Sequence, residues 1–322
     1  MPSSLPQSIF TILDVYNGGW TPLTVPNPPL LVQGTAGNDD ITFTPVLLSV
    51  VDAGDGNDRI TITGGLAAGI NGGNGKDQIF GGNGADIVDG GAGNDYIVGG
   101  RGLDELNGGA GNDTLSYESA ISVRSGPGIT LTLNANGGVN VGQFNAGSTD
   151  AGVDLITGGF ENVVGTNDDD RITGNAGNNI LVGLNGEDTL TGGNGNDTLI
   201  GGRDRDGLIG GGGNDTFVFL AMSDSVGGNA ATIDSILDFG VTTGDHDIID
   251  VSRIDANLNQ PGDQAFQLVG LVRSRDDVHA GQIGYTAVDS GDTVQVVAVQ
   301  AGGGQMVINL SDQDVAAPDF IL

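Results

Sequence analysis

Aspartate recurs every nine residues in a glycine-rich setting, a spacing that could bind metal ions. From Gly72 to Ser116 five repeats follow one another without a gap: GGNGKDQIF, GGNGADIVD, GGAGNDYIV, GGRGLDELN and GGAGNDTLS. Each has glycine at positions one, two and four, an acid at position six and an apolar residue at position eight. Carboxylates beside glycine turns supply oxygen ligands, which hard divalent cations prefer. The chain has no cysteine, so thiolate sites for zinc or copper are excluded.

Composition and charge limit the classes of partner and of chemistry. The 41 acidic and 10 basic residues give a net charge of -31, which disfavours nucleic acids and anionic membranes and favours cations. No apolar run is long enough to span a membrane. His246 and His279 are the only histidines, and neither has a G-x-S-x-G elbow, a cysteine or a second histidine to work with. We therefore expect no catalytic residues and no enzymatic activity.

The repeats form two arrays. The first covers 34 to 116: it begins with GTAGNDDIT and AGDGNDRIT, passes a degenerate repeat with Ala68 at position six, and continues into the five repeats above. The second covers 165 to 218 with GTNDDDRIT, GNAGNNILV, GLNGEDTLT, GGNGNDTLI, GGRDRDGLI and GGGGNDTFV. The other segments predict an N-terminal cap or lead-in at 1 to 33 and a β insertion at 117 to 164, with a strand from Ile129. From 219 to 322 the period ends and a C-terminal β domain is expected.

The residues of one repeat predict its geometry. Glycine at positions one, two and four allows positive φ in a tight turn, so that consecutive carbonyls point into a space that the position-six carboxylate closes. Positions seven to nine form a short strand whose middle side chain points inward. Two repeats make one flattened coil, and position six of one coil lies about 4.8 Å from position six of the next. Carboxylates at that distance repel each other unless a cation lies between them.

This pattern resembles the GGxGxDxUx nonapeptide of the RTX, or haemolysin-type, calcium-binding repeat family over residues 34 to 218. The resemblance implies an all-β fold, a parallel β-roll, with calcium bridging the turns along both edges. Pairs of position-six residues one coil apart number three in the first array and four in the second, so about seven ions are expected. The implied ligands are carbonyls at positions one and three and side chains at position six: Asp39, Asp58, Gly72, Asn74, Asp77, Gly81, Asn83, Asp86, Gly90, Ala92, Asp95, Gly99, Arg101, Asp104, Gly108, Ala110, Asp113, Asp170, Asn179, Asp188, Gly192, Asn194, Asp197, Gly201, Arg203, Asp206, Gly210, Gly212 and Asp215.

A few positions depart from the motif. The neutral amide of Asn179 should weaken the sites that it touches, and the repeat with Ala68 is expected to bind no ion. Asp168 and Asp204 replace the glycine of position four, which is tolerable because aspartate enters the left-handed backbone region more readily than most residues.

Three features outside the repeats have two interpretations each. The stretch GDHDIID could supply a further calcium ligand through Asp245 or Asp247, or it could be a turn that leads into a strand. Trp20 and Tyr117 fit core or cap residues better than ligand platforms.

The C-terminal region carries a second resemblance. DTFVF, TIDSILDF, GDHDIIDVSRIDAN and AFQLVG are similar to the C-terminal domain of serralysin-type secreted metalloproteases over about residues 215 to 322, although HExxH is absent. The terminus Asp319-Phe320-Ile321-Leu322 resembles an uncleaved type I secretion signal. No basic residue precedes Arg59, so the N-terminus lacks the charged region of a secretory signal. The alternative is that DFIL forms a last strand.

These observations predict a secreted, extracellular calcium-binding protein that folds when it binds calcium outside the cell, with the type I secretion apparatus as a partner. One alternative is a surface or adhesion module that binds a polysaccharide or a protein, which an exposed aromatic or flat apolar patch would favour. Another is a relative of secreted proteases or polysaccharide-modifying enzymes with a carbohydrate-active site on the insertion, which two close carboxylates in a cleft would favour.

Overall fold

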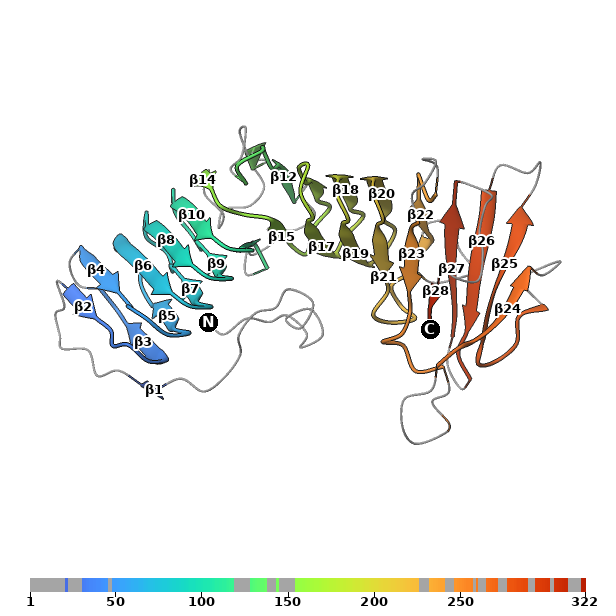
Figure 1. The fold of residues 1–322 in the computed structure, drawn as a ribbon, viewed down its shortest axis with the longest axis horizontal. Coiled ribbons are helices and arrows are strands. Elements are labelled where there is room, and N and C mark those ends of the chain that lie inside the picture. The colour runs from blue at the N-terminus through green and yellow to red at the C-terminus, as the bar shows by residue number, and fades with distance from the viewer. Residues whose placement is uncertain are drawn as a thin grey trace. The chain divides into compact units, whose positions relative to one another are not determined.

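The computed structural model of the chain describes residues 21–22, 31–45, 48–118, 128–137, 143–144, 154–225, 232–240, 246–256, 259, 265–271, 277–288, 293–301, 304–311 and 320–322. Trp20, Asp245 and Asp319 lie outside these residues. The chain divides into two compact units, Met1–Asn167 and Asp168–Leu322 (Figure 1), called here the N-terminal and the C-terminal unit. The described residues form strands and no α-helix, as the all-β prediction requires, and so include no helix that could cross a membrane.

The N-terminal unit contains two parallel sheets of short strands. Strands alternate between the sheets along the chain, because each coil contributes one strand to each sheet. The first sheet contains β1 (Thr21–Pro22), β3 (Asp39–Phe43), β5 (Arg59–Ile62), β7 (Gln78–Phe80), β9 (Tyr96–Val98), β11 (Thr114–Ser116) and β15 (Asn162–Val164). The second contains β2 (Leu31–Gln33), β4 (Ser49–Asp52), β6 (Ala68–Asn74), β8 (Ile87–Ala92), β10 (Glu105–Ala110) and β14 (Leu155–Gly158). Within the insertion, β12 (Ile129–Thr132) pairs antiparallel with β13 (Gln143–Phe144).

The C-terminal unit continues the same alternation. One sheet contains β17 (Ile180–Asn185), β19 (Thr198–Arg203), β21 (Thr216–Val218), β23 (Ile248–Asp250) and β28 (Phe320–Ile321). The other contains β16 (Arg171–Thr173), β18 (Thr189–Asn194), β20 (Gly207–Gly212), β22 (Asp234–Ile236), β27 (Gln305–Leu310), β26 (Thr293–Val299), β25 (Gln282–Val288) and β24 (Gln267–Leu271). Strands β25, β26 and β27 pair antiparallel. The stacking register therefore continues past Phe219 into β22 and β23, although the glycine pattern ends there.

Position eight forms the core of each roll, as predicted. Successive coils place these side chains in register, for example Ile79 beside Ile97 and Leu190 beside Leu208. The position-eight residues of both arrays are buried: Ile79, Val88, Ile97, Leu106, Leu115, Leu181, Leu190, Leu199, Leu208 and Phe217. Position eight alone supplies one inserted side chain per nine residues, and strands of one sheet bury further residues such as Phe80, Tyr96 and Val98.

The turn glycines serve two different purposes, which corrects one prediction. Positions two and four mostly adopt positive φ, for example 102° at Gly73 and 142° at Gly75, a region that favours glycine. Position one does not adopt positive φ, and its glycine is required for space. At Gly72 an added β-carbon would lie 2.6 Å from Oδ2 of Asp77 and closer still to the carbonyl oxygen of Gly90.

Candidate metal sites

Position-six side chains stack along both edges of the N-terminal unit. Along edge A the backbone N–H of each residue donates to Oδ1 of the acid one coil further on. The donor–acceptor distances are 2.7 Å from Asp58 to Asp77, 2.9 Å from Asp77 to Asp95 and 2.8 Å from Asp95 to Asp113. The row begins at Asp39, whose N–H donates to Asp58. Edge B follows the same rule through Ala68, Asp86 and Asp104.

The C-terminal unit repeats this ladder along two further edges. Edge C runs from Asp170 to Asp188 to Asp206, with N–H to Oδ1 distances of 2.7 and 2.9 Å. Edge D runs through three more position-six residues, Asn179, Asp197 and Asp215, at 2.8 Å each. The structure thus brings the predicted position-six residues together in the predicted rows.

In most of these position-six carboxylates Oδ1 accepts a backbone N–H, whereas Oδ2 accepts no hydrogen bond. Within the described part of the chain, eleven aspartate Oδ2 atoms are buried without a hydrogen-bond partner. Each of these side chains is nearly or fully buried. Ten are at position six of a repeat, and the eleventh is Asp234: Asp58, Asp77, Asp86, Asp95, Asp104, Asp113, Asp188, Asp197, Asp206, Asp215 and Asp234. A buried, unpaired carboxylate oxygen is costly, and a bound cation would satisfy it.

The glycines of position one allow oxygens of two coils to converge beside the backbone. The point that a β-carbon of Gly72 would occupy lies beside two oxygens that have converged, Oδ2 of Asp77 and the carbonyl of Gly90 from the next coil. The same pair of atom types converges at Gly81, Gly90, Gly183 and Gly192. These sites combine one carboxylate with backbone carbonyls, which matches the all-oxygen donor set of calcium. No group of three or more acidic or histidine side chains that could hold a metal occurs in the described residues.

Position two decides whether Oδ2 stays free. Where glycine there adopts φ near +100°, as at Gly54 and Gly73, the carboxylate oxygen is unpaired. Thr35 does not adopt positive φ, and its N–H donates to Oδ2 of Asp39 at 2.7 Å. In the same way Asn175 donates to Oδ1 of Asn179 at 2.8 Å. In these two turns the side-chain oxygen accepts an N–H of its own turn, so the predicted ligands Asp39 and Asn179 differ from the acids whose Oδ2 is unpaired.

The structure refines the predictions for the carbonyls of position three and for the aspartates that replace glycine at position four. Position-three carbonyls accept backbone N–H groups of the preceding coil, for example Gly75 N–H to the carbonyl of Ala92 at 2.7 Å. One lone pair of that oxygen is therefore engaged, and any ion would use the second. Asp204 adopts φ of +80°, as predicted for an aspartate in place of glycine, whereas Asp168 does not adopt positive φ.

Burial and mutual repulsion disfavour the charged form of these carboxyls. Burial, followed by repulsion from Asp170 and Asp206, raises the pKa of Asp188 to about 9. Burial and the neighbouring acids raise the pKa of Asp95 to about 8. On edge D, burial and then Asp215 raise the pKa of Asp197 to about 7. A carboxyl with a pKa this high takes up a proton or a cation near neutral pH.

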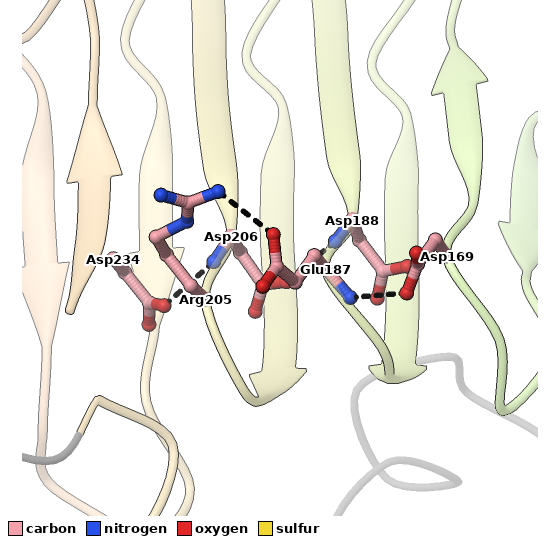
Figure 2. Close-up of polar contacts among 6 residues, drawn as sticks. All are labelled: Asp169, Glu187, Asp188, Arg205, Asp206 and Asp234. Atoms are coloured by element: carbon pink, nitrogen blue, oxygen red, sulfur yellow. Dashed lines mark hydrogen bonds and ion pairs between the residues drawn. The ribbon is translucent and has the colours of Figure 1, made fainter. Parts of the chain in front are cut away.

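Position five distinguishes edge C from edge D. Figure 2 shows edge C, where Glu187 N–H donates to Asp169 at 2.9 Å and Arg205 pairs with Glu187 at 2.7 Å. On edge D the corresponding residues are neutral amides: Asn196 N–H donates to Asn178, and Asn214 N–H to Asn196, at 2.8 and 2.9 Å. Sequence reasoning did not find these position-five ladders.

Four acids outside the two predicted arrays continue the ladders. Asp113 N–H donates to Glu161 on edge A, and Asp104 N–H to Asp154 on edge B. On edges C and D the acceptors are Asp234 and Asp247 for the N–H groups of Asp206 and Asp215. Each acid is followed by a strand residue in the position-seven register. The detectable signal is the half-motif DxUx, or ExUx, without its glycine turn: DLIT, ENVV, DSIL and DIID.

Comparison with known proteins identifies the repeats. The model of the RTX calcium-binding nonapeptide repeat matches four times, at residues 70–97, 89–119, 156–190 and 182–217. The chain carries RTX calcium-binding repeats. These RTX repeats imply that the protein binds calcium, and the unpaired carboxylate oxygens lie at their position six. A search of curated proteins found no match.

Three solved structures are similar to parts of this chain. The solution structure of the AlgE6R2 subunit of the Azotobacter vinelandii mannuronan C5-epimerase matches with 26% identity and a TM-score of 0.35, covering 48% of this chain and 89% of that one. The AlgE6R3 subunit of that enzyme matches with 28% identity and a TM-score of 0.35, covering 48% and 78%. The extracellular lipase LipA from Serratia marcescens matches with 14% identity and a TM-score of 0.30, covering 85% of this chain and 45% of the lipase.

Proposed function

We propose that this chain is a secreted calcium-binding RTX protein whose roll folds when calcium binds. The observation that carries the proposal is the set of buried Oδ2 atoms without partners along both edges of each unit. Without ions, folding would bury these oxygens uncompensated, and neighbouring carboxylates would repel each other. Extracellular calcium modules have dissociation constants of about 10⁻⁴–10⁻³ M, so the ions would be bound outside the cell and absent in the cytosol.

The in-array pairs suggest about seven ions, and the structure modifies this number. Asn179 offers no free amide oxygen, which argues against one pair, whereas Asp58 and Asp77 form a further pair on edge A. A bound ligand stabilises the folded state by an amount that grows with the ratio of the free ligand concentration to the dissociation constant. Several weak sites acting together would make folding a steep function of calcium concentration.

The experiment is far-ultraviolet circular dichroism during a calcium titration. We expect an unordered spectrum in chelator and a strand-rich spectrum in millimolar calcium, with magnesium at the same concentration as the control. A strand-rich spectrum that a strong chelator leaves unchanged would refute the proposal.

Export is the second part of the proposal. Proteins with RTX repeats are typically secreted, and the C-terminal residues resemble a type I secretion signal. In the fold, Phe320 is buried, stacks on Tyr285 with ring centroids 6.4 Å apart, and belongs to β28, which pairs with β23. A secretion apparatus could therefore bind these residues only before the roll folds. A form that ends at residue 308 should fold less stably with calcium and stay inside the cell. Its normal export would remove the C-terminal signal.

A binding surface for a protein is a second candidate function, and one observation favours it. Along the outer face of the second sheet of the N-terminal unit, Leu31, Val50, Ile87 and Leu155 lie at position seven in one register. Their side chains are 58%, 47%, 60% and 59% exposed. Gly69 and the exposed Glu105 occupy the same register between these residues, so the row is aliphatic but interrupted by one charge. It contains no aromatic ring, which suits a protein partner better than a polysaccharide, since sugars pack on aromatic rings. Replacing Ile87 and Leu155 by serine should abolish pull-down of a surface partner while calcium-induced folding persists.

We propose a non-enzymatic role for the chain. His246 and His279 are exposed. The close carboxylates along the edges of the rolls belong to repeat turns, where calcium ligation accounts for them. Assays against alginate-type polysaccharides, lipid esters and casein in calcium would test this role, and turnover of any of them would overturn it.

A further inference from the structure

Asp234 lies outside the recognised repeats but occupies the position-six place of edge C. Strand β22 pairs with β20 so that Ser235 lies beside Gly207 and Ile236 beside Leu208, the register of positions seven and eight. Asp206 N–H donates to Oδ1 of Asp234 at 2.8 Å, the bond that links successive acids within the arrays. Figure 2 shows Asp234 continuing the row after Asp206.

Asp234 differs from two other acids that end a ladder. Oδ2 of Asp154 accepts the hydroxyl of Tyr117 at 3.3 Å, and Oδ2 of Asp247 accepts the N–H of Gly240 at 2.8 Å. These two acids are capped by the protein itself. Oδ2 of Asp234 is buried without a partner in the described residues, and the side chain is 0% exposed. Asp234 thus has the unpaired oxygen that distinguishes the position-six acids of the repeats.

The surroundings of Asp234 are buried and contain two further acids, one of which, Asp224, has its charged form favoured by nearby Arg203. Asp206 is 1% exposed with its own Oδ2 unpaired. Asp224 is also buried and close enough to repel Asp234. Oδ2 of Asp224 accepts the N–H groups of Leu220 and Ala221, which holds that carboxylate in place. The N–H of Asp206 donates to Oδ1 of Asp234. The Ser225 hydroxyl donates to the carbonyl of Val307 and accepts the backbone N–H of Asp234, so the second carboxylate oxygen of Asp234 is left unmatched.

We propose that Asp234 and Asp206 hold a divalent, oxygen-preferring cation, calcium in the extracellular setting, beyond the sites of the nonapeptide repeats. This inference rests on the proposed function, because it extends the same chemistry by one coil. The ion would join the end of the second array to β22 and so to β27, with which β22 pairs. Calcium would then order a segment that carries no glycine-turn motif.

The test is calcium stoichiometry and calcium-dependent thermal stability of the full chain. Asp234→Asn keeps the Oδ1 acceptor for Asp206 N–H and removes the charge, and should bind one ion fewer than the natural protein. Asp247→Asn is the matched control at the end of edge D, and should bind the same number. An unchanged number in Asp234→Asn would overturn the inference and leave the proposed function intact. A natural protein that binds no calcium would overturn the proposed function.

A second measurement needs no variant, in case Asp234→Asn does not fold. Crystals of the natural protein grown with terbium, which replaces calcium, should show an anomalous peak at a coordination distance of about 2.3–2.6 Å from Oδ2 of Asp234. Peaks at the repeats with none beside Asp234 would overturn the inference. The absence of peaks at the repeats as well would count against the proposed function.

Discussion

Edges C and D belong to the same unit and the same coils, yet they differ in the charge around their carboxylates. Edge C has acids at each position six from Asp170 to Asp234 and the charged residues Asp169, Glu187 and Arg205 at position five. Edge D begins with the neutral Asn179 and carries asparagines at position five. The stacking geometry is therefore independent of charge, whereas the need for a cation is not. Burial first, and then repulsion from Asp170 and Asp206, raises the pKa of Asp188 to about 9, whereas burial and then Asp215 alone raise the pKa of Asp197 to about 7. At Asp206 on edge C the pKa is also raised to about 7, so the contrast applies to the central acid Asp188.

The pH dependence of the metal-free protein should show the largest effect. Folding raises the pKa of Asp188 and Asp197 above the ordinary value of 3.8, so the folded state binds more protons than the unfolded state from about pH 4 to about pH 9. Stability without metal must then fall as pH rises through this window. Each such carboxyl contributes up to about 1.4 kcal/mol per pH unit. We expect the calcium-free protein to be more folded at pH 5 than at pH 8, as measured by circular dichroism.

The same measurement compares the two edges. Asp188→Asn should flatten the pH dependence at pH 7 to 9 more than Asp197→Asn, because Asp188, with a pKa of about 9, titrates across this range, whereas Asp197, with a pKa of about 7, completes its titration near the lower end. Equal slopes in the two variants would contradict the assigned difference between the edges. In calcium the trend should reverse, since protons compete with the ion for the same oxygens.

Removing one carboxylate from each edge should have the next largest effect. Asp188 lies between the two acids Asp170 and Asp206, whereas Asp197 lies between Asn179 and Asp215. Asp188→Ala should therefore raise the calcium concentration needed for half-folding more than Asp197→Ala, by roughly tenfold, or about 1.4 kcal/mol. Calcium titrations followed by circular dichroism would measure both midpoints. Coinciding midpoints would show that the neighbouring acids do not matter.

The regular parts of this picture could be predicted from the sequence, because a strict nine-residue period fixes which residues stack. The core at position eight and the rows of position six follow from that period, and the strand from Ile129 follows from the apolar alternation of its own residues. The ladder ends at Asp154, Glu161, Asp234 and Asp247 could not be predicted so directly, since they lack the glycine turn and keep only the register of the strand.

The closed turn at Asn179 and the pairing of the last strand could not be predicted from the motif. The closure of the turn on Asn179 depends on the backbone handedness of position two rather than on a consensus residue. The pairing of β28 with β23 joins segments about seventy residues apart, which local pattern cannot assign.

A gain of function on edge D would sharpen the comparison further. Asn179→Asp restores the charge, and Asn175→Gly allows the positive φ that removes the N–H from the position-six oxygen. The double variant should bind one more calcium ion than the natural protein and fold at a lower calcium concentration. Asn179→Asp alone should give a smaller gain, because Asn175 still donates to that oxygen. Isothermal calorimetry would count the ions, and an unchanged count in the double variant would refute the role of position two.

The smallest effect concerns backbone strain in a turn of edge C. Leu184 is at position two of the turn that leads to Asp188 and adopts φ of +92°, where the other position-two residues with positive φ are glycines. A left-handed conformation costs a residue with a β-carbon about 1–2 kcal/mol, and the half-buried side chain of Leu184 recovers part of this by packing. Leu184→Gly should therefore stabilise the calcium-loaded protein by about 1 kcal/mol, or raise Tm by about 2–4 °C. Gly193→Ala provides the control on edge D, because Gly193 is at the same position with φ of +122°, and it should lower Tm. A lower Tm for Leu184→Gly would mean that packing of the leucine outweighs its strain, so that edge C retains this residue for stability.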